Sequence, residues 1–235
     1  MDKKLETQIK KRFEKIGRDY NSITNKKTFQ YYQERRKKYL EEICENIGRD
    51  KIIIDLAAGT GAYSENISNH CFLLNMDLSF NALKANTILN DRILKINANA
   101  LNIPLKNNSV DSILLIGLLH HIPNDLPELF REILRVLKND GTVVIDEPNG
   151  YNLTWFIYMK LCKIDKFEAK PLFPYAIKKL AKRFYLKIEK DLYWGFVPPL
   201  PNKQFIINIF NRIGLIIEKS FLSCLCTRYL LILKK

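Results

Sequence analysis

A glycine-rich segment preceded by a carboxylate is the part of this sequence best suited to hold a ligand. Asp55 falls within the apolar run Ile52–Leu56, and Ala57-Ala58-Gly59-Thr60-Gly61 follows directly. Glycine tolerates backbone angles that other residues avoid and lets the main chain come close to a ligand. A helix that begins at about Ala62 would point its free N–H groups at that ligand. A Gly-x-Gly alone also fits an ordinary strand-to-helix turn, so other residues must support the assignment.

Polar side chains also stand at the predicted ends of the other strands. Asp77 closes the apolar run that starts at Cys71, and it lies 22 residues after Asp55. Nucleotide-binding α/β folds place an acid at about this distance to accept hydrogen bonds from ribose hydroxyls. The alternative role for Asp77 is to cap the helix that follows it. Because the carboxyl ends of parallel strands meet at one edge of a sheet, these two acids indicate a ligand site together with three other residues: Asn99, His121 and Glu147.

His121 is a candidate general base at the predicted end of the fourth strand. It follows the apolar run Val110–Leu119 and is adjacent to His120. Imidazole takes up and returns a proton near neutral pH, so His121 could deprotonate a substrate that must lose a proton before it reacts. The alternative is that His120 and His121 only pack at the strand end.

The elements that must position these residues alternate between strand and helix. Asp125 followed by Glu128 matches a capping box, and apolar residues at helical spacing continue to Lys138. A short polar turn, Asn139-Asp140-Gly141, leads into the next strand. This alternation predicts a parallel, doubly wound sheet, in which ligands bind at the carboxyl ends of the strands. The predicted strands cover residues 52–56, 71–77, 92–97, 110–119 and 142–146, and the predicted helices begin at about 62, extend over 79–89 and extend over 126–138.

The segments on either side of this alternating core follow other patterns. Residues 2–18 and 28–47 have helical spacing of apolar residues, and Gly48 is expected to end the second helix. Tyr20, in the linker between them, is expected either to pack on the domain or to lean over a ligand. Residues 151–183 interleave aromatic residues with lysines and are expected to cover the strand ends. A strand at 184–194, a helix at about 202–221 and a strand at 227–233 are expected to follow.

Composition places the chain among α/β proteins of one domain. Its 235 residues can bury a substantial core, and 47% hydrophobic with 27% charged residues is ordinary for a globular protein. No run approaches the length of a membrane span, and the N-terminal sequence lacks the apolar segment of a signal peptide, so we expect a cytoplasmic location. The five cysteines are scattered, and Cys224-x-Cys226 has no second pair to complete a zinc site, so we expect reduced thiols and no metal.

Positive charge is concentrated outside the middle of the chain. Residues 1–54 hold 15 Lys and Arg against 9 Asp and Glu, residues 55–150 hold 7 against 11, and residues 151–235 hold 16 against 5. Such a surplus usually keeps a surface soluble, but it also attracts anionic substrates, lipid headgroups or RNA.

Blocks of residues in a fixed order resemble the class I S-adenosylmethionine-dependent methyltransferases, and among them the small-molecule branch that includes the ubiquinone/menaquinone-type C-methyltransferases. The match is close over residues 50–150, and the flanks agree only in layout. The resemblance implies an α/β fold with a Rossmann-like, doubly wound, mainly parallel seven-stranded sheet and helical N-terminal and lid segments. The matching blocks are Asp55–Gly61, Asp77, Asn99-Ala100 with Ile103-Pro104, Leu119–Ile122, Arg131–Lys138 and Glu147–Asn149.

The resemblance also implies how the chain is divided and which residues meet the cofactor, S-adenosylmethionine. Gly59 and Gly61 would meet its amino acid end, Asp77 its ribose, and Asn99 with Ala100 its adenine. The expected parts are an N-terminal helical cap at 1–50, a cofactor-binding core at 51–150, a substrate lid at 151–184, and a segment at 185–235 that completes the sheet. The expected cofactor-binding residues are Tyr20, Asp55, Ala57, Gly59, Thr60, Gly61, Asp77, Leu78, Asn99, Ala100 and Gly117, and His121 is the candidate catalytic residue because its imidazole can act as a base.

Two positions depart from related patterns. The family usually has Asp where this chain has Asn99. An amide oxygen can still accept from the adenine amino group, with a weaker hydrogen bond than a charged one. Ser64 stands where the Gly-x-Gly-x-x-Gly pattern of nicotinamide-binding folds has its third glycine, so a nicotinamide cofactor fits less well.

The implied activity is methyl transfer to a small-molecule acceptor. An aromatic or lipid-like acceptor body would suit an apolar pocket with a basic rim, and the basic flank could also contact an anionic membrane. A nucleic-acid methyltransferase is an alternative that would use the basic flanks and the interleaved aromatic residues. Against it, the fourth strand ends without the Asp/Asn-Pro-Pro-aromatic motif of amino-directed base methyltransferases. A non-catalytic cofactor-binding protein is the other alternative, and the intact loop and ribose acid disfavour it.

Overall fold

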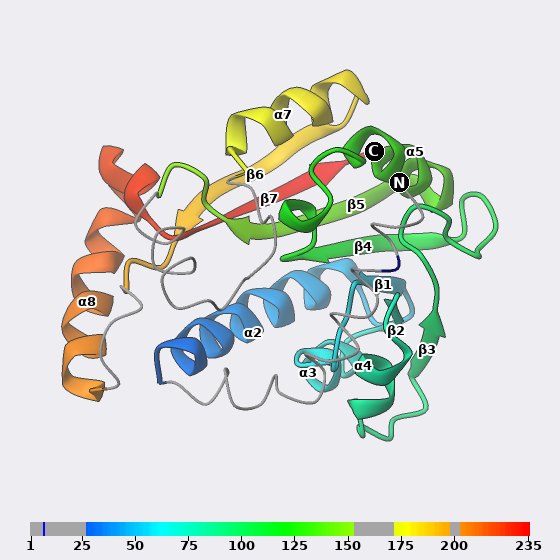
Figure 1. Ribbon diagram of the computed structural model, residues 1–235, viewed down its shortest axis with the longest axis horizontal. Helices are drawn as coiled ribbons and strands as arrows, with labels where there is room; N and C mark the ends of the chain where they lie inside the picture. Colours follow the sequence, from blue (N-terminus) through cyan, green and yellow to red (C-terminus); the bar gives the residue numbers. More distant parts are fainter. Residues whose placement is uncertain (1–6, 8–26, 153–171, 198–202) are drawn as a thin grey trace.

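Seven strands form a single sheet in the computed structural model, which describes residue 7 and residues 27–152, 172–197 and 203–235. The strands are β1 (Ile52–Leu56), β2 (Phe72–Asp77), β3 (Ile93–Asn97), β4 (Val110–Ile116), β5 (Leu137–Pro148), β6 (Lys187–Trp194) and β7 (Arg228–Lys234). Their order across the sheet is β3-β2-β1-β4-β5-β7-β6 (Figure 1). Strands β1 to β5 are parallel, and β7 runs antiparallel to both β5 and β6. The predicted Rossmann-like, mainly parallel sheet is confirmed.

Helices cover both faces of this sheet (Figure 1). They are α2 (Lys27–Ile47), α3 (Ser64–Ser68), α4 (Phe80–Ala85), α5 (Leu126–Val136), α7 (Pro174–Arg183) and α8 (Gln204–Ile217), with short 3-10 helices η1 (Leu119–His121) and η2 (Phe221–Leu225). Buried side chains of α2, α3 and α8 form one core cluster with one face of the sheet. Those of α5 and α7 form a second cluster with the other face.

Strand β1 lies at the middle of the sheet because both of its faces are apolar. Ile53 belongs to the cluster under α2, whereas its neighbour Ile54 belongs to the cluster under α5. Successive side chains of a strand point to opposite faces, so a run of isoleucines without polar alternation suits a strand that is covered on both sides. The chain passes from β1 to β2 and β3 on one side and then crosses to β4 and β5 on the other. The carboxyl ends of β1 and β4 therefore form the switch point at which such sheets bind ligands.

Three local predictions were wrong for identifiable reasons. Strand β4 ends at Ile116 and not at Leu119, because Gly117 takes a positive φ of 65° and η1 follows. Helix α4 ends at Ala85 and not near residue 89, because Asn86 is extended, with ψ at 102°. Asp125 occupies the N-cap of α5, but its side chain makes no capping hydrogen bond in the described part of the chain. Its ψ of 10° is not the extended conformation of a capping residue, and Pro127 has no N–H to donate.

Residues 151–183, predicted to cover the strand ends, are described by the structure only in part. Residues 174–183 form α7, which buries Ile177 and Ala181 in the same core cluster as Phe130 of α5. This part covers a face of the sheet. The stretch 153–171, the predicted helix at 2–18 and Tyr20 lie outside the described residues. Among the helices that are described, none combines the length and hydropathy that a membrane span requires.

Candidate functional site

The glycine loop turns sharply where β1 ends. Ala57 takes a left-handed φ of 68°, and the N–H groups of Ala57 and Ala58 both donate to the carbonyl of Met76, at 2.8 and 3.1 Å. Gly59 follows with φ at 57°. A Cβ atom at Gly59 would have no neighbour within 4 Å among the described residues. Among the described residues the space beside the Gly59 main chain is therefore open, and the contact of Gly59 with a cofactor stays a prediction.

Asp77, at the end of β2, is joined to this loop. Its Oδ2 accepts a hydrogen bond from the Gly59 N–H at 2.8 Å, and its Oδ1 accepts one from the Ser79 N–H at 2.7 Å. Burial raises the pKa of the Asp77 carboxyl, and the two backbone hydrogen bonds oppose that shift. A carboxylate has about four lone-pair sites, so acceptor capacity remains for ribose hydroxyls. Ser79, and not Asp77, caps α4, since its side chain accepts from Ala82.

Gly61 is required by packing inside the protein. It has a φ of 71°, and a Cβ atom there would lie 2.0 Å from Nδ2 of Asn86 and 2.6 Å from Oγ of Ser64. That Ser64 hydroxyl accepts hydrogen bonds from Asn75 at 2.6 Å and from Asn86 at 3.3 Å. Ser64, which stands where nicotinamide-binding folds have their third glycine, thus links the loop by hydrogen bonds to β2 and to the end of α4. The predicted approach of Gly61 to the cofactor stays a prediction.

Asp55 is buried within β1, close to the second acid. Burial, and to a lesser degree the charge of Asp77, raise its pKa, the Arg36 guanidinium lowers it, and the net result is a pKa of about 7. The carboxyl groups of Asp55 and Asp77, at the ends of adjacent strands, are therefore close enough for the charge of one to disfavour ionisation of the other.

The end of β3 is also connected to Asp77. The Asn97 amide donates to the carbonyls of Asp77 and Leu78, at 2.9 and 3.0 Å. Oδ1 of Asn99 accepts from the Leu101 N–H at 2.9 Å, which shapes the turn after the strand. Thr60, Leu78, Asn99 and Ala100 are all half-buried at this edge.

The end of β4 carries a buried histidine–carboxylate pair that the sequence did not single out. Nδ1 of His120 lies 2.6 Å from Oε2 of the fully buried Glu147, and Oε1 of Glu147 accepts from the Leu119 N–H at 2.7 Å. His121 is half-buried and its ring lies 3.9 Å from that of His120. Gly117 precedes them and donates its N–H to the Asp146 carbonyl at 2.9 Å. The Glu147 carboxylate therefore orients the ring of His120.

Two buried arginines meet at the carboxyl end of β5. Arg36 of α2 donates from Nε to Oδ2 of Asp146 at 2.7 Å, and Arg228 donates from Nη2 to Oδ1 at 3.0 Å. Arg36 also donates to the hydroxyl of Tyr63, directly before α3, at 2.6 Å. Burial lowers the pKa of Arg228 and the nearby Arg36 lowers it further, whereas Asp146 raises the pKa of Arg36 against its burial. The two cations share the Asp146 carboxylate, and the neighbouring Glu147 carboxylate also raises the pKa of Arg228.

Sequence reasoning missed these pairs, although some signals were present. Arg36 lies four residues from both Tyr32 and Leu40, on the buried face of α2, and a charged residue on such a face needs a partner. Glu147 was noticed at a strand end, but nothing local indicates that His120 would be its partner. Arg228 shows no local signal at all.

The described site residues fit the cofactor that the resemblance implies. The open main chain at Gly59, the Asp77 carboxylate and the half-buried Asn99 lie at the ends of three neighbouring strands, β1, β2 and β3. Backbone N–H groups and a carboxylate suit the amino acid end and the ribose of such a molecule. Tyr20 lies outside the described residues and is not part of this comparison.

Comparisons with known proteins agree with this geometry. Residues 54–145 match a family model described as "Methyltransferase domain". The chain is 27% identical to a demethylmenaquinone methyltransferase of Staphylococcus epidermidis, over 91% of this chain and 88% of that protein. It is 28% identical to an uncharacterized protein of Methanocaldococcus jannaschii over 63% of this chain, and it spans only about half (55%) of that relative's length.

A solved structure has the same fold. The crystal structure of an S-adenosylmethionine-dependent methyltransferase from Archaeoglobus fulgidus superimposes with a TM-score of 0.65 and 17% identity, covering 86% of this chain and 94% of that one. The matched residues run from Ile54, within β1, to Ile145, within β5, and so include the loop and Asp77. Residues 54–145 therefore contain a methyltransferase domain, the chain has the fold of S-adenosylmethionine-dependent methyltransferases, and its sequence is similar to the menaquinone type.

Proposed function

We propose that this protein transfers the methyl group of S-adenosylmethionine to a small-molecule acceptor that has an aromatic or lipid-like body. The observation that carries the proposal is the hydrogen bond between Gly59 and Asp77, since it joins the glycine loop and the ribose acid into one site. The acceptor class is supported by relatives named demethylmenaquinone methyltransferase, which align with about nine-tenths of this chain. We further propose that the protein works in the cytoplasm.

The residues at the strand ends would bind and orient rather than react. The bound cofactor supplies an already activated methyl group on its sulfonium. We propose that Asp77 holds the ribose, Asn99 holds the adenine, and the N–H groups at Gly59 and Thr60 face the amino acid end. Arg36 lies beside this loop through its bond to Tyr63 and would attract the carboxylate of that end. Fixing the cofactor in this way allows the acceptor atom to be held in line with the methyl group.

An acceptor that must lose a proton needs a base near the switch point. We propose His121 for this role, with His120 as the second candidate because Glu147 orients its ring. When Nδ1 of His120 carries the hydrogen bonded to Glu147, its Nε2 is left to take up a proton. Substituting each histidine in turn distinguishes the roles of the two neighbouring rings.

The proposal is tested by cofactor binding and by methyl transfer to pools of acceptors. We expect the wild-type protein to bind S-adenosylmethionine at about micromolar level, and Asp77→Ala to weaken binding by roughly 10- to 150-fold, which corresponds to about 1.5–3 kcal/mol for hydrogen bonds to a charged group. Calorimetry measures the affinity. Asp111→Ala, at the opposite end of the sheet, removes an acid that also accepts a backbone hydrogen bond, from Ile52, and serves as the matched control.

Labelled methyl donor then identifies the acceptor class. Quinone-like and lipid extracts, soluble metabolites and structured RNA are offered separately, and transfer into the first group supports the proposal. Transfer into RNA would favour the nucleic-acid alternative. Tight cofactor binding without transfer into any pool would indicate a non-catalytic binding protein, and unchanged affinity in Asp77→Ala would contradict the assignment of the cofactor loop.

A further inference from the structure

Helix α8 and η2 together carry an exposed apolar surface, which we call the α8–η2 patch. Its most exposed members are Phe221, with 90% of its surface accessible, and Phe205 and Ile216, with 73% each. Monomeric proteins rarely leave so many large apolar side chains together in water. The patch consists of Phe205, Ile209, Ile213, Leu215, Ile216, Phe221, Leu222 and Leu225.

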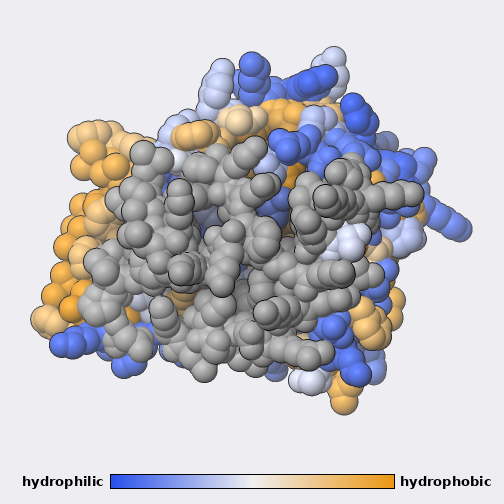
Figure 2. Space-filling model, in the orientation of Figure 1, coloured by the Kyte–Doolittle hydropathy of each residue, from blue (hydrophilic) through white to orange (hydrophobic). Residues whose placement is uncertain are grey.

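The spacing along α8 explains why these side chains point outward. Ile207 and Gly214, seven residues apart, are the buried positions of the helix and mark the side that packs on the protein. Phe205, Ile209 and Ile216 follow the opposite side at intervals of four and seven residues. The sequence of α8 is thus apolar on both sides, although the fold covers only one. Figure 2 shows the outcome as hydrophobic surface at the left edge of the molecule, over α8 and η2.

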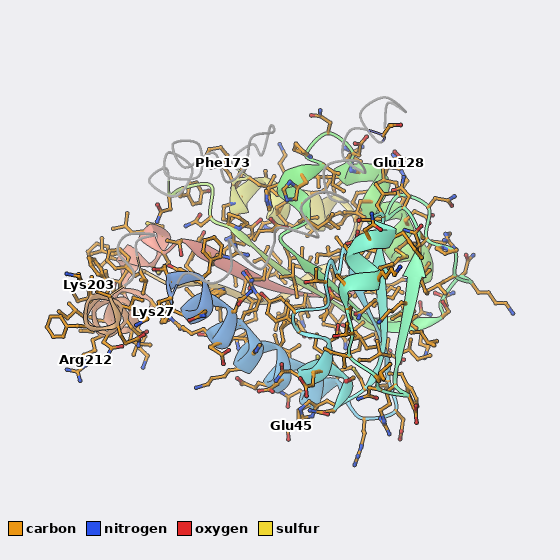
Figure 3. All side chains as sticks on the ribbon, turned by 60° about the horizontal axis from the view of Figure 1, so that its bottom comes forward. Lys27, Glu45, Glu128, Phe173, Lys203 and Arg212 are labelled. Atoms are coloured by element: carbon orange, nitrogen blue, oxygen red, sulfur yellow. The ribbon has the colours of Figure 1, made fainter. Side chains whose placement is uncertain are left out.

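Positive charge accompanies the patch. Lys203, Arg212 and Lys219 are exposed. Figure 3 shows Lys203, at the N-cap of α8, and Arg212, on α8, at the outer edge of the molecule. Within residues 203–226 the one acidic residue is Glu218, and it is held in an ion pair by Arg35 at 2.6 Å. The surface therefore combines apolar side chains with net positive charge.

We propose that the α8–η2 patch binds the surface of an anionic lipid bilayer. Interfacial helices of this kind insert their apolar side into the headgroup region while lysines and arginines contact acidic lipids. Arg212 lies among the apolar residues, and its aliphatic stem can follow them while the guanidinium reaches the headgroups. A second copy of the chain fits less well, because a symmetric contact would bring the same cations against each other.

The patch adjoins the edge of the sheet that carries the site. The buried side chain of Asn149, directly after β5, donates to the carbonyls of Cys224 and Cys226 at 2.9 and 2.7 Å. Asn152 donates to the carbonyl of Leu225 at 2.7 Å. These bonds fasten η2 to the segment that follows Glu147, so a bilayer bound at the patch would lie next to the carboxyl end of β5. The inference itself needs neither a bound cofactor nor a particular acceptor.

Flotation of the full chain with vesicles tests the inference. Vesicles of phosphatidylcholine alone are compared with vesicles that also contain anionic phosphatidylglycerol, at low and high salt. We expect binding to the anionic vesicles that salt weakens. The variant Phe205→Ser/Ile216→Ser/Phe221→Ser should bind at least about tenfold more weakly. Leu89→Ser is the control, because Leu89 is 97% exposed and lies between α4 and β3, away from the patch.

A charge variant gives a second, independent measurement. Lys203→Gln/Arg212→Gln/Lys219→Gln should reduce binding by roughly fivefold for each cation, or about 100-fold in total. The matched control is Lys179→Gln/Lys182→Gln/Arg183→Gln, which removes the same charge from exposed positions of α7. Equal losses in the patch and control variants would overturn the inference.

Three other outcomes would also overturn it. Failure of the full chain to float, or equal binding to neutral vesicles, would exclude an anionic bilayer as the partner. A dimer in sedimentation experiments that the serine variant abolishes would assign the patch to a second copy. A large fall in thermal stability of the serine variant would show that another part of the chain covers the patch. Because none of these measurements involves methyl transfer, their failure is distinguishable from failure of the proposed activity.

Discussion

The Asp77 carboxylate accepts hydrogen bonds from the N–H groups of Gly59 and Ser79, and these bonds fix its orientation. If Asp77 binds a ribose as proposed, a carboxylate held in this way would not have to be reoriented, which would lower the entropic cost of binding. The same bonds make Asp77 part of the loop structure. Asp77→Ala should therefore affect both the ligand and the loop, whereas Asp77→Asn keeps an acceptor oxygen and separates the two effects.

Substitution of the two histidines distinguishes their roles. We expect His121→Ala to lower the rate of methyl transfer by about 10² or more with little change in cofactor affinity, as for a lost general base. His120→Asn is the comparison, because its amide can still donate to Glu147 but cannot take up a proton. Single-turnover rates and calorimetry are the measurements. If methyl transfer is slow in His120→Asn but normal in His121→Ala, His120 is the base. If the rate is normal in both variants, the two histidines have only a structural role.

Asp55 should make stability depend on pH. Its pKa is raised from an ordinary value of 3.8 to about 7 by burial and by Asp77, so the folded chain keeps a proton that the unfolded chain has lost. The free energy of unfolding should therefore fall as the pH rises from about 4 to about 7, by at most about 1.4 kcal/mol for each pH unit, and level off above. Asp55→Asn should flatten this slope. Urea unfolding across that range measures it, and an identical slope in the variant would show that Asp55 is not responsible.

At the scale of elements, the strand-to-helix turn after β1 is built from two glycines with different functions. Gly59 leaves space above the loop, whereas Gly61 leaves space for Asn86, whose side chain is held by Ser64 and by the Ile88 N–H. Both have positive φ. Their substitutions should therefore have different consequences.

Gly61→Ala should destabilise the fold more than Gly59→Ala. The methyl group at Gly61 would overlap Asn86 in addition to the left-handed strain, so we expect a loss of about 2–4 kcal/mol. Gly59→Ala carries only the strain, about 1–2 kcal/mol, but it projects a methyl group into the open side of the loop and should weaken cofactor binding. Urea unfolding and calorimetry measure the two effects. Equal losses of stability would mean that Asn86 moves away without cost.

At the scale of the whole molecule, the buried cluster of Arg36, Asp146 and Arg228 joins distant parts of the chain. Arg36 belongs to the first described helix, α2, and Arg228 to the last strand, and they are 110 and 82 residues from Asp146. Trp194 lies over the Arg36 guanidinium at 5.7 Å and completes the enclosure. The cluster thus attaches α2 to the sheet edge that carries the site.

Asp146→Ala should destabilise the protein by about 3–5 kcal/mol, because it leaves two buried guanidinium groups without their shared carboxylate. The measurement is the free energy of unfolding in urea at neutral pH. Asp191→Ala is the control, since it breaks the partly exposed pair with Lys178 and should cost no more than about 1 kcal/mol. Similar small losses in both variants would show that Arg36 and Arg228 find other partners.

The sequence by itself determined the features that depend on neighbouring residues. The apolar run at Ile52 and the alternation of strands and helices after it were sufficient to predict the central parallel strands, because these signals are local and repeat along the chain. The placement of the cofactor site at Gly59 and Asp77 stays a prediction. The end of α4 and the cap of α5 were predicted wrongly. They depend on the backbone angles of Asn86 and Asp125, which the residue type alone does not specify.

Only the tertiary structure decided which distant residues meet and which surfaces stay open. His120 pairs with Glu147 across 27 residues, and Arg36 with Asp146 across 110, because the sheet order brings the ends of β4 and β5 together beneath α2. An apolar helix such as α8 looks the same in sequence whether one side or both are covered. Its exposed side becomes visible only when the fold shows what packs against it, because burial is a property of the surroundings and not of the residue.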